Sequence, residues 1–554
     1  MAVVIIALVV GVGIRVARLA SVPPGLAPDE ACNGYDAYSI LTTGHDHHGN
    51  FLPLAMQGFG DYRMPLFTYS LVPLVAAFGL KPSVVRLGAA LWGIVDLVAI
   101  TVLAGLMMGW PAAAAAALFG ALSPWHLSIS RYATEEIVGS CTITLGMLFF
   151  FLWLRWRQGR WLLLSGALFG LSLYSYAITK AFLPPLIVLL TALYWHELRA
   201  MRLKAVAAAA IVLLLAVPQA VLLLHHTAEM QARFNVLSLF HTIATCPACD
   251  PAKAGATGRP FFYQLIGFAA NGLSYFTPSF LFLVGDRGSH WAMLHPPGFG
   301  QLMPEQAPLI LLALVGVISV RRRKITLLLA GWLIVATLPA ALTIPEGAFA
   351  PDAGGMPTPH VMANYPVLRT PLTPALLLSH PDSRHAVLAM APWILLSALG
   401  FVVLLDWTSR MPALRAAATG LILAGAIFHS AQFVRYYFRD YPALAAPYFQ
   451  DGIGPALQAV DKLDDGHQPI VITPRINEPY IYVLFFERYP PAKFTGLSPF
   501  FIAFDRYSFA DPNWAYARLF HGIFVYSGSD QLPKSPASSI RYPDGTVAYN
   551  IVVK

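Results

Sequence analysis

The sequence predicts a polytopic α-helical membrane protein that ends in a small α/β domain. Of the 554 residues, 57% are hydrophobic and only 12% are charged, about half the charged fraction of an ordinary soluble domain. Apolar runs of about 15 to 25 residues recur from Val3 to Phe433, and a helix needs about 20 residues to cross the hydrocarbon. After about Arg435, charges, prolines and short alternating runs return.

The first apolar run, residues 2–20, is interpreted as a membrane span. It lacks the charged leading region of a signal peptide, because its basic residues Arg15 and Arg18 come late. A net charge of +8 and a pI near 9.2 would suggest nucleic acid in a soluble protein. In a membrane protein the excess belongs to cytoplasmic loops, so we expect no nucleic-acid partner.

Clusters of Lys and Arg set the predicted topology, because cytoplasmic loops carry an excess of both. The clusters are Arg155–Arg160, Arg199–Lys204, Arg321–Lys324 and Arg410–Arg415. With a cytoplasmic N-terminus, the loops 21–83, 125–133, 178–182, 225–305 and 344–384 and the tail then face the outside. We therefore expect a multi-pass protein of the inner (plasma) membrane with a periplasmic C-terminal domain.

Residues 65–80 are short for a span. The topology set by the Lys and Arg clusters also leaves the loops on both sides of this run outside, so the run is predicted to be an interfacial or re-entrant helix. About eleven spans remain. They are residues 2–20, 84–108, 111–124, 134–154, 161–177, 181–196, 204–224, 306–320, 325–343, 385–405 and 412–433.

The predicted modules are therefore a membrane module, residues 1–434, and an extracytoplasmic α/β domain, residues 435–554. In the tail, Gly454–Leu463 has the pattern of an amphipathic helix, and Pro469–Thr473, Tyr480–Phe486, Gly522–Tyr526 and Thr546–Val553 have strand-like patterns. Within the second long loop, Phe261–Val284 is apolar enough to lie on or dip into the membrane.

Two adjacent carboxylates, Asp29 and Glu30, follow the first span closely. One reading is structural, since Pro28, Asp29 and Glu30 would start a helix well, with acidic groups at the positive end of the helix dipole. The other reading is chemical, because such a loop brings carboxylates to the membrane surface.

The family resemblance rests on three segments of the first outer loop. They are Asp29-Glu-Ala-Cys-Asn-Gly-Tyr-Asp-Ala-Tyr, then His45-Asp-His-His-Gly, then Gly60-Asp-Tyr-Arg-Met-Pro-Leu-Phe. Together they resemble the first outer loop of GT-C membrane glycosyltransferases, such as protein O-mannosyltransferases and lipid A aminoarabinose transferases (glycosyltransferase family 39 type). Supporting matches are Val85-Arg-Leu-Gly, Ser123-Pro-Trp-His, Gly285-Asp-Arg and Asn477-Glu-Pro-Tyr.

The resemblance implies a GT-C fold and transfer of a sugar from a polyprenyl-phosphate donor to a protein, lipid A or cell-envelope glycan acceptor. It assigns the general base to Asp29, with Glu30 as an alternative or helper. Direct displacement implies inversion at the anomeric carbon, without a covalent glycosyl enzyme.

Cations are expected at the phosphate of the donor, where negative charge develops as it leaves. Arg63 is the first candidate, because the family pattern has a basic residue before a proline. The others are Arg131, Lys180, Arg384 and His385. Arg131 could instead anchor the membrane interface or pair with Glu135, and Lys180 could be an interfacial residue.

A divalent metal is a second option, held by His45, Asp46 and His48, whose side chains are suitable ligands. Adjacent residues seldom share one ion, however, and no spaced histidine pair appears. The other paired feature is Cys246-Pro-Ala-Cys249, which favours structural or incidental thiols over redox chemistry because no thioredoxin-like pattern surrounds it.

Two rival functions share this membrane architecture. A secondary transporter would show related halves and charges near the bilayer midplane, whereas Asp96 is the only clear mid-span acid here. A flippase or sugar-polymer ligase would handle the same lipid carriers. The sequence leaves the sugar and the acceptor open.

Overall fold

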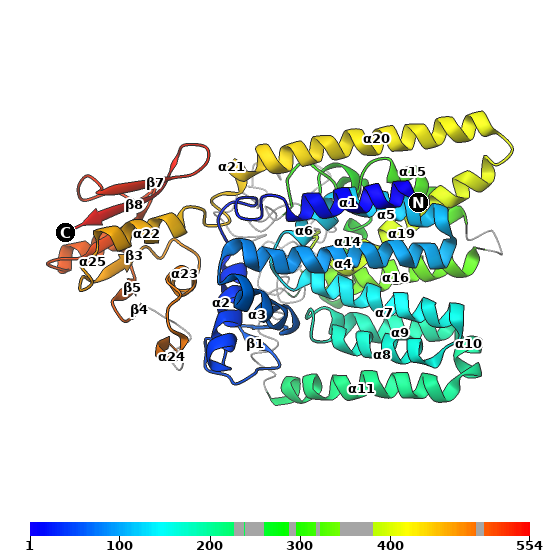
Figure 1. Ribbon diagram of the computed structural model, residues 1–554, viewed down its shortest axis with the longest axis horizontal. Helices are drawn as coiled ribbons and strands as arrows, with labels where there is room; N and C mark the ends of the chain where they lie inside the picture. The colour runs from blue at the N-terminus through cyan, green and yellow to red at the C-terminus, as the bar shows by residue number, and fades with distance from the viewer. Residues whose placement is uncertain (226–237, 239–259, 287–294, 317–321, 344–380, 495–502) are drawn as a thin grey trace. The chain divides into compact units, whose positions relative to one another are not determined.

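The computed structural model describes residues 1–554 apart from 226–237, 239–259, 287–294, 317–321, 344–380 and 495–502 (Figure 1). Cys246, Cys249 and much of the two long loops 225–305 and 344–384 therefore lie outside the described residues. The chain forms two compact units, each assembled from distant segments. Unit 1 comprises Met1–Arg15, Leu91–Ser130 and Glu135–Val434, and unit 2 comprises Val16–Ala90, Arg131–Thr134 and Arg435–Lys554. By contacts, the first long loop, residues 21–83, therefore groups with the tail, while the division at residues 434 and 435 stays a prediction.

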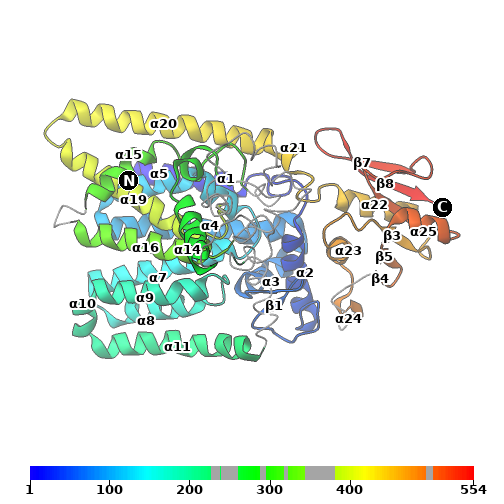
Figure 2. The ribbon, with the colours of Figure 1, turned by 180° about the vertical axis from the view of Figure 1, so that it is seen from behind.

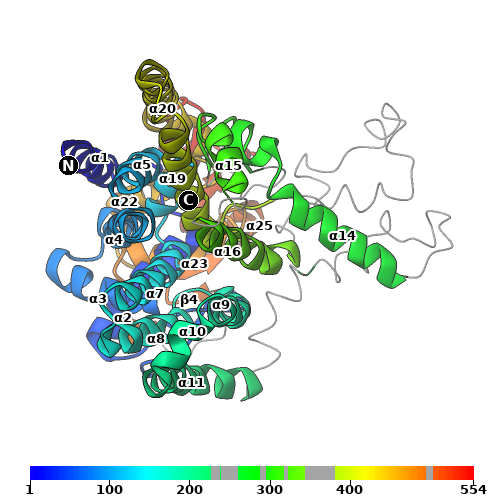
Figure 3. The ribbon, with the colours of Figure 1, turned by 90° about the vertical axis from the view of Figure 1, so that its right-hand side faces the viewer.

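Unit 1 is a helical bundle, and many of its helices are seen nearly end-on in Figure 3. In the described part of the chain its helices are α1 (Ala2–Val16), α4 (Pro82–Met108, whose first turns belong to unit 2), α5 (Trp110–Leu122), α6 (Pro124–Ser130), α7 (Glu136–Trp156), α8 (Gly159–Ser172), α9 (Thr179–Leu193), α10 (Trp195–Ala200), α11 (Arg202–His225), α14 (Pro260–Ser274), the π-helix η1 (Ser279–Leu283), α15 (Gln306–Val315), α16 (Arg323–Ala341), the 3₁₀-helix η4 (Val387–Ala389), α19 (Met390–Trp407) and α20 (Pro412–Arg439), which ends in unit 2.

Six helices of the described chain are long and apolar enough to cross a membrane, and α5 with α6 would make a seventh if this pair, bent by 58°, is one span. The six are α4, α7, α11, α16, α19 with its 3₁₀ lead-in, and α20. The other predicted spans coincide with the shorter helices α1, α8, α9 and α15. Each predicted span thus contains a helix, but the count of about eleven crossings is not confirmed.

The break between α5 and α6 shows how a buried charge is used inside this bundle. Pro124 has no backbone N–H to continue the ladder, so carbonyls at the end of α5 lose their helical partners. Arg15 of α1 supplies donors instead, at 3.0 Å from the Gly120 oxygen and 3.2 Å from the Ala121 oxygen. Arg15 also donates to the Gly11 oxygen at 2.9 Å and lies 2.8 Å from His126 Nδ1. The fully buried arginine therefore stabilises the bend.

Unit 2 begins with the loop that holds α2 (Pro28–Thr43), a two-stranded ribbon of β1 (Met56–Gln57) and β2 (Tyr62–Arg63), and α3 (Leu66–Phe78). At 13 residues, α3 would extend about 20 Å, short of the roughly 30 Å hydrocarbon thickness. Its length agrees with the interfacial or re-entrant helix predicted at residues 65–80.

The tail of unit 2 contains a six-stranded sheet with strand order β4-β5-β3-β6-β8-β7, in which β5, β3 and β6 are parallel. Figure 2 labels its strands β3, β4, β5, β7 and β8. α25 covers one face through a core that includes Val471, Phe524 and Val552. The elements are α21 (Tyr441–Ala445), α22 (Ile453–Leu463), β3 (Ile470–Ile472), α23 (Pro479–Phe486), α24 (Pro491–Phe494), β4 (Ala503–Phe504), β5 (Tyr507–Phe509), α25 (Pro512–Arg518), β6 (Ile523–Ser527), β7 (Ser538–Arg541) and β8 (Val547–Val553).

Most tail predictions are confirmed, namely the helix α22 and the strands β3, β6 and β8. The strand predicted at Tyr480–Phe486 is wrong, because these residues form α23. Pro479 starts that helix, and Tyr480 to Phe485 are all buried. A segment that is apolar on every side carries no periodicity, so burial alone could not separate a strand from a helix.

Candidate functional site

The first turn of α2 gives the adjacent acids Asp29 and Glu30 different environments. Pro28 is the first helical residue, and Glu30 Oε2 accepts a hydrogen bond from the Ala27 backbone N–H at 3.0 Å. This is the reach-back half of a capping box. Ala27 has no side-chain acceptor of its own, and Asp29 makes no cap contact. The capping role therefore belongs to Glu30.

Glu30 is also the centre of a buried ion pair with Arg86 at the start of α4. Glu30 Oε1 accepts from Arg86 Nε at 2.9 Å and from the Ala133 N–H at 3.1 Å, and Oε2 accepts from Arg86 Nη2 at 2.8 Å. With the Ala27 bond, four donors satisfy the two carboxylate oxygens, and both side chains are 0% exposed. Glu30 is therefore held as a charged structural group.

Arg86 also fixes the backbone that leads into α2. It donates to the carbonyl oxygens of Leu19, Pro23 and Gly25 at 3.4, 2.6 and 2.9 Å. Gly25 itself has a φ of +62°, and a Cβ there would lie 2.4 Å from the Phe449 oxygen. Arg86 and Gly25 therefore fix the conformation of the backbone that leads to Asp29.

Asp29 is half-buried, and no hydrogen bond or ion pair to its carboxylate occurs within the described residues. Its neighbour in charge is Glu478, whose pKa is raised by burial and then by the negative charge of Asp29. Glu478 precedes α23 with a φ of 51°, a left-handed conformation that is uncommon for a residue other than glycine. The charge of Asp29 thus acts on a second acid, Glu478. Sequence reasoning had matched Glu478 only to the family, without a role.

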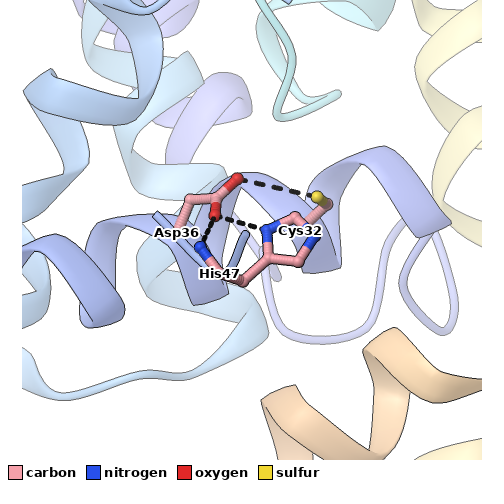
Figure 4. Close-up of side chains that lie close together, drawn as sticks. All are labelled: Cys32, Asp36 and His47. Atoms are coloured by element: carbon pink, nitrogen blue, oxygen red, sulfur yellow. Dashed lines mark hydrogen bonds and ion pairs between the residues drawn. The ribbon is translucent and has the colours of Figure 1, made fainter. Parts of the chain in front are cut away.

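Arg63, at the end of β2, is buried, and its guanidinium lies against α2, the helix that carries Asp29. Its Nη1 donates to Asn33 Oδ1 at 2.6 Å, and its Nη2 lies 2.8 Å from Cys32 Sγ and 3.0 Å from Asp36 Oδ2. Asp36 also accepts from His47 Nδ1 at 2.6 Å (Figure 4). His47 and Arg63 lower the Asp36 pKa to about 2, against the effect of burial. The charge on Arg63 is therefore fixed beside α2.

The other predicted cations have other surroundings. Arg131 donates to the Val22 oxygen at 2.6 Å and lies over the rings of Tyr437 and Phe438, at 5.6 and 4.9 Å from their centroids. It belongs to unit 2, but its contacts are those of a packing residue. Lys180, Arg384 and His385 belong to unit 1, not to the unit that holds Asp29.

Around Arg384, unit 1 contains a polar cluster that sequence reasoning missed. Arg384 pairs with Asp382 at 2.8 Å, and Asp286 accepts from the Ser383 backbone N–H and hydroxyl at 2.9 and 2.6 Å. Burial and Asp382 raise the Asp286 pKa, whereas Arg384 and His385 lower that of Asp382. The Gly285-Asp-Arg match to the family pointed to Asp286 in the sequence. It could not reveal Ser383, the hydrogen-bond partner of Asp286, which lies about a hundred residues later in the chain.

The residues predicted as metal ligands have loop-forming roles. Both oxygens of Asp46 accept from Asn50, at 2.9 to 3.3 Å, and Oδ1 also accepts from the His48 N–H at 3.0 Å. His45 Nδ1 lies 2.8 Å from the Thr43 oxygen. In the described residues, the group that brings three ligand atoms within 4.8 Å of one another is Cys32, Asp36 and His47, not His45, Asp46 and His48.

Comparison with known proteins bears on the fold and on the family resemblance. Residues 63–222 match the family model for dolichyl-phosphate-mannose-protein mannosyltransferases. The fold is similar to ArnT from Cupriavidus metallidurans in the apo state, with a TM-score of 0.53 and 12% identity over 99% of this chain and 97% of that one. The structure of the same protein bound to undecaprenyl phosphate gives the same values. No curated relative matches the sequence.

These findings confirm the resemblance to GT-C membrane glycosyltransferases predicted from the sequence. The chain is a multi-pass membrane protein with this fold and a C-terminal sheet. Its likenesses are to the dolichyl-phosphate-mannose-protein mannosyltransferase family over residues 63–222 and to the fold of ArnT.

Proposed function

We propose that this protein is an inverting glycosyltransferase that moves a sugar from a polyprenyl-phosphate donor to an acceptor outside the cytoplasm. The observation that carries the proposal is the division of roles between the two adjacent acids. Glu30 is neutralised by Arg86 and fully hydrogen-bonded. Asp29 has no such partner in the described chain. One acid builds the loop, and the other is available for chemistry.

Asp29 acts as the general base. The acceptor hydroxyl or amine attacks the anomeric carbon and forms the new bond, while the bond from that carbon to the phosphate oxygen breaks and its electron pair leaves with the polyprenyl phosphate. The acceptor proton passes to Asp29, which must lie within hydrogen-bond reach of it. A single displacement of this kind inverts the anomeric configuration.

Arg63 binds the phosphate of the donor. It is held on Asn33, four residues after Asp29 on α2, so the two side chains share one helix face about one turn, roughly 6 Å, apart. That separation suits a base at the acceptor and a cation at the leaving group. The developing phosphate charge would then meet a guanidinium that is already oriented. Arg131 packs against aromatic rings and Arg384 pairs with Asp382, and neither is linked to α2 in the way that Arg63 is. The roles predicted for these two residues and for Lys180 and His385 stay predictions.

The donor class is supported by the ArnT structure bound to undecaprenyl phosphate and by the dolichyl-phosphate-mannose family match. We place the protein in the inner membrane with the N-terminus in the cytoplasm and the first loop and tail outside, from the charge register. The acceptor is a protein, lipid A or another envelope glycan.

Reconstitution in liposomes tests the reaction. Polyprenyl-phosphate donors labelled in the sugar are supplied with extracted envelope acceptors, and the label in lipid and in acceptor is followed separately. The proposal predicts transfer to an acceptor fraction, with the opposite anomeric configuration in the product. If labelled lipid crosses the bilayer and no acceptor is labelled, the protein is a flippase. An exposed control, Asp465→Asn in the tail, should transfer at the wild-type rate.

A further inference from the structure

We propose that Cys32, Asp36 and His47 form a binding site for a Zn²⁺-like divalent cation, and that the Arg63 guanidinium occupies this site when the metal is absent. The inference concerns metal binding alone and does not depend on the proposed transfer reaction. It differs from the metal site predicted at His45, Asp46 and His48.

The three side chains converge because of the local fold. Cys32 and Asp36 are four residues apart on α2, so both project from one helix face. The loop after α2 then returns His47, whose backbone N–H donates to Asp36 Oδ1 at 3.0 Å. All three residues are buried, and Figure 4 shows them turned toward one another. The site is thus built by a helix and one anchored loop.

The separations suit a tetrahedral metal. Ligands at about 2.0 to 2.3 Å from zinc lie roughly 3.3 to 3.8 Å from one another. Cys32 Sγ and Asp36 Oδ2 are 3.7 Å apart. His47 Nδ1 lies 2.6 Å from Asp36 Oδ1, so coordination through Oδ2 needs only a small rotation that replaces this hydrogen bond. The fourth position remains for water or another small ligand.

The donor set selects the metal class. Thiolate and imidazole ligands suit Zn²⁺ and similar transition metals, whereas Mg²⁺ and Ca²⁺ prefer oxygen. Metal binding also requires the thiolate, so the Cys32 proton is released to solvent on binding. One thiolate, one carboxylate and a neutral imidazole together carry two negative charges, which balance a divalent cation. If Arg63 stayed beside them, it would add one positive charge that nothing in this group balances.

Arg63 marks the place of the cation in the metal-free protein. Its Nη2 lies 2.8 Å from Cys32 Sγ and 3.0 Å from Asp36 Oδ2, the two atoms that a metal would bridge. A guanidinium and a divalent ion cannot share these contacts in a buried space without strong repulsion. Metal and Arg63 therefore compete, and removal of Arg63 should tighten metal binding.

Cobalt is the probe, because Co²⁺ replaces Zn²⁺ in tetrahedral sites and a thiolate ligand gives a near-ultraviolet charge-transfer band. The full-length protein is titrated in detergent with Cys246 and Cys249, which lie outside the described residues, replaced by serine throughout. We expect about one bound ion with a thiolate band. Cys32→Ser should abolish the band, and His47→Gln should weaken binding more than about tenfold. The other buried thiol, tested by Cys141→Ser, should leave the titration unchanged.

Arg63→Gln gives the sharper test, because loss of a positive charge from a phosphate site and from a metal site have opposite consequences. The proposal predicts that cobalt binds the Arg63→Gln variant at least about tenfold more tightly than it binds the otherwise identical protein that retains Arg63. Thermal unfolding of each variant without metal shows whether it is folded. Weaker cobalt binding by folded Arg63→Gln, or an unchanged band in folded Cys32→Ser, would overturn the proposal, as would the absence of any bound cobalt.

Discussion

Replacing Glu30 by glutamine should destabilise the protein, whereas replacing Asp29 by asparagine should not. Glu30→Gln keeps the shape of the side chain but leaves the 0% exposed Arg86 without its counter-ion. Breaking a buried ion pair costs about 3 to 5 kcal/mol. The carbonyl oxygens of Leu19, Pro23 and Gly25 still accept hydrogen bonds from Arg86. We therefore expect a loss of stability at the lower end of this range, about 3 kcal/mol.

The measurement is thermal unfolding in detergent, followed by intrinsic fluorescence. A loss of about 3 kcal/mol should lower Tm by several degrees, since larger domains shift by about 2 to 4 °C per kcal/mol. Asp29→Asn should stay within about 0.5 kcal/mol of wild type. In a double-mutant cycle, Glu30→Gln with Arg86→Met should cost less than the sum of the single changes. Equal Tm values for wild type and Glu30→Gln would refute the assignment of Glu30 as the structural acid.

Three further changes test the surroundings of Asp29. Arg63→Ala should raise KM for the lipid donor about tenfold or more, the value of a charged hydrogen bond, while the acceptor KM changes little; equal losses for both substrates would count against phosphate binding. The folded Asp36 pKa of about 2 lies below its unfolded value of about 3.9, so its stabilisation is complete above about pH 4 and is lost as the pH falls toward 2. The Tm difference between wild type and Asp36→Asn should therefore persist from pH 8 to 5 and shrink only below about pH 4; closure of the gap between pH 7 and 5 would contradict this. Gly25→Ala should prevent normal folding, because its Cβ would lie 2.4 Å from the Phe449 oxygen. Gly60→Ala, with a φ of +83° and no neighbour within 4 Å, isolates the backbone cost, and equal yields of folded protein from both would show that the close approach is unimportant.

The membrane helices could be predicted from the sequence because their signal is local. An apolar run bounded by charges is visible without knowing its neighbours, and each predicted span does contain a helix. The number of crossings could not be settled in this way, since α1, α8, α9 and α15 are short and length alone does not decide them. The strand predicted at Tyr480–Phe486 failed for a related reason, because complete burial removes periodicity.

The site was only partly predictable, because its contacts join distant residues. The sequence identified Asp29, Glu30 and Arg63 as a group through family resemblance. It could not distinguish the two acids, because that depends on Arg86, which lies 56 residues after Glu30. The group with metal-ligand spacing, Cys32, Asp36 and His47, could not be read from the sequence, because the pairing of His47 with Asp36 requires the loop to return to α2.

The rate of sugar transfer by Asp29→Asn tests the central claim most directly. Single-turnover transfer from the labelled polyprenyl-phosphate donor is compared for wild type and Asp29→Asn, at equal concentrations of folded protein judged by Tm. Loss of a general base predicts a rate lower by about 10² to 10⁴-fold, with donor binding retained. A folded Asp29→Asn protein that transfers sugar within about tenfold of the wild-type rate would contradict the account.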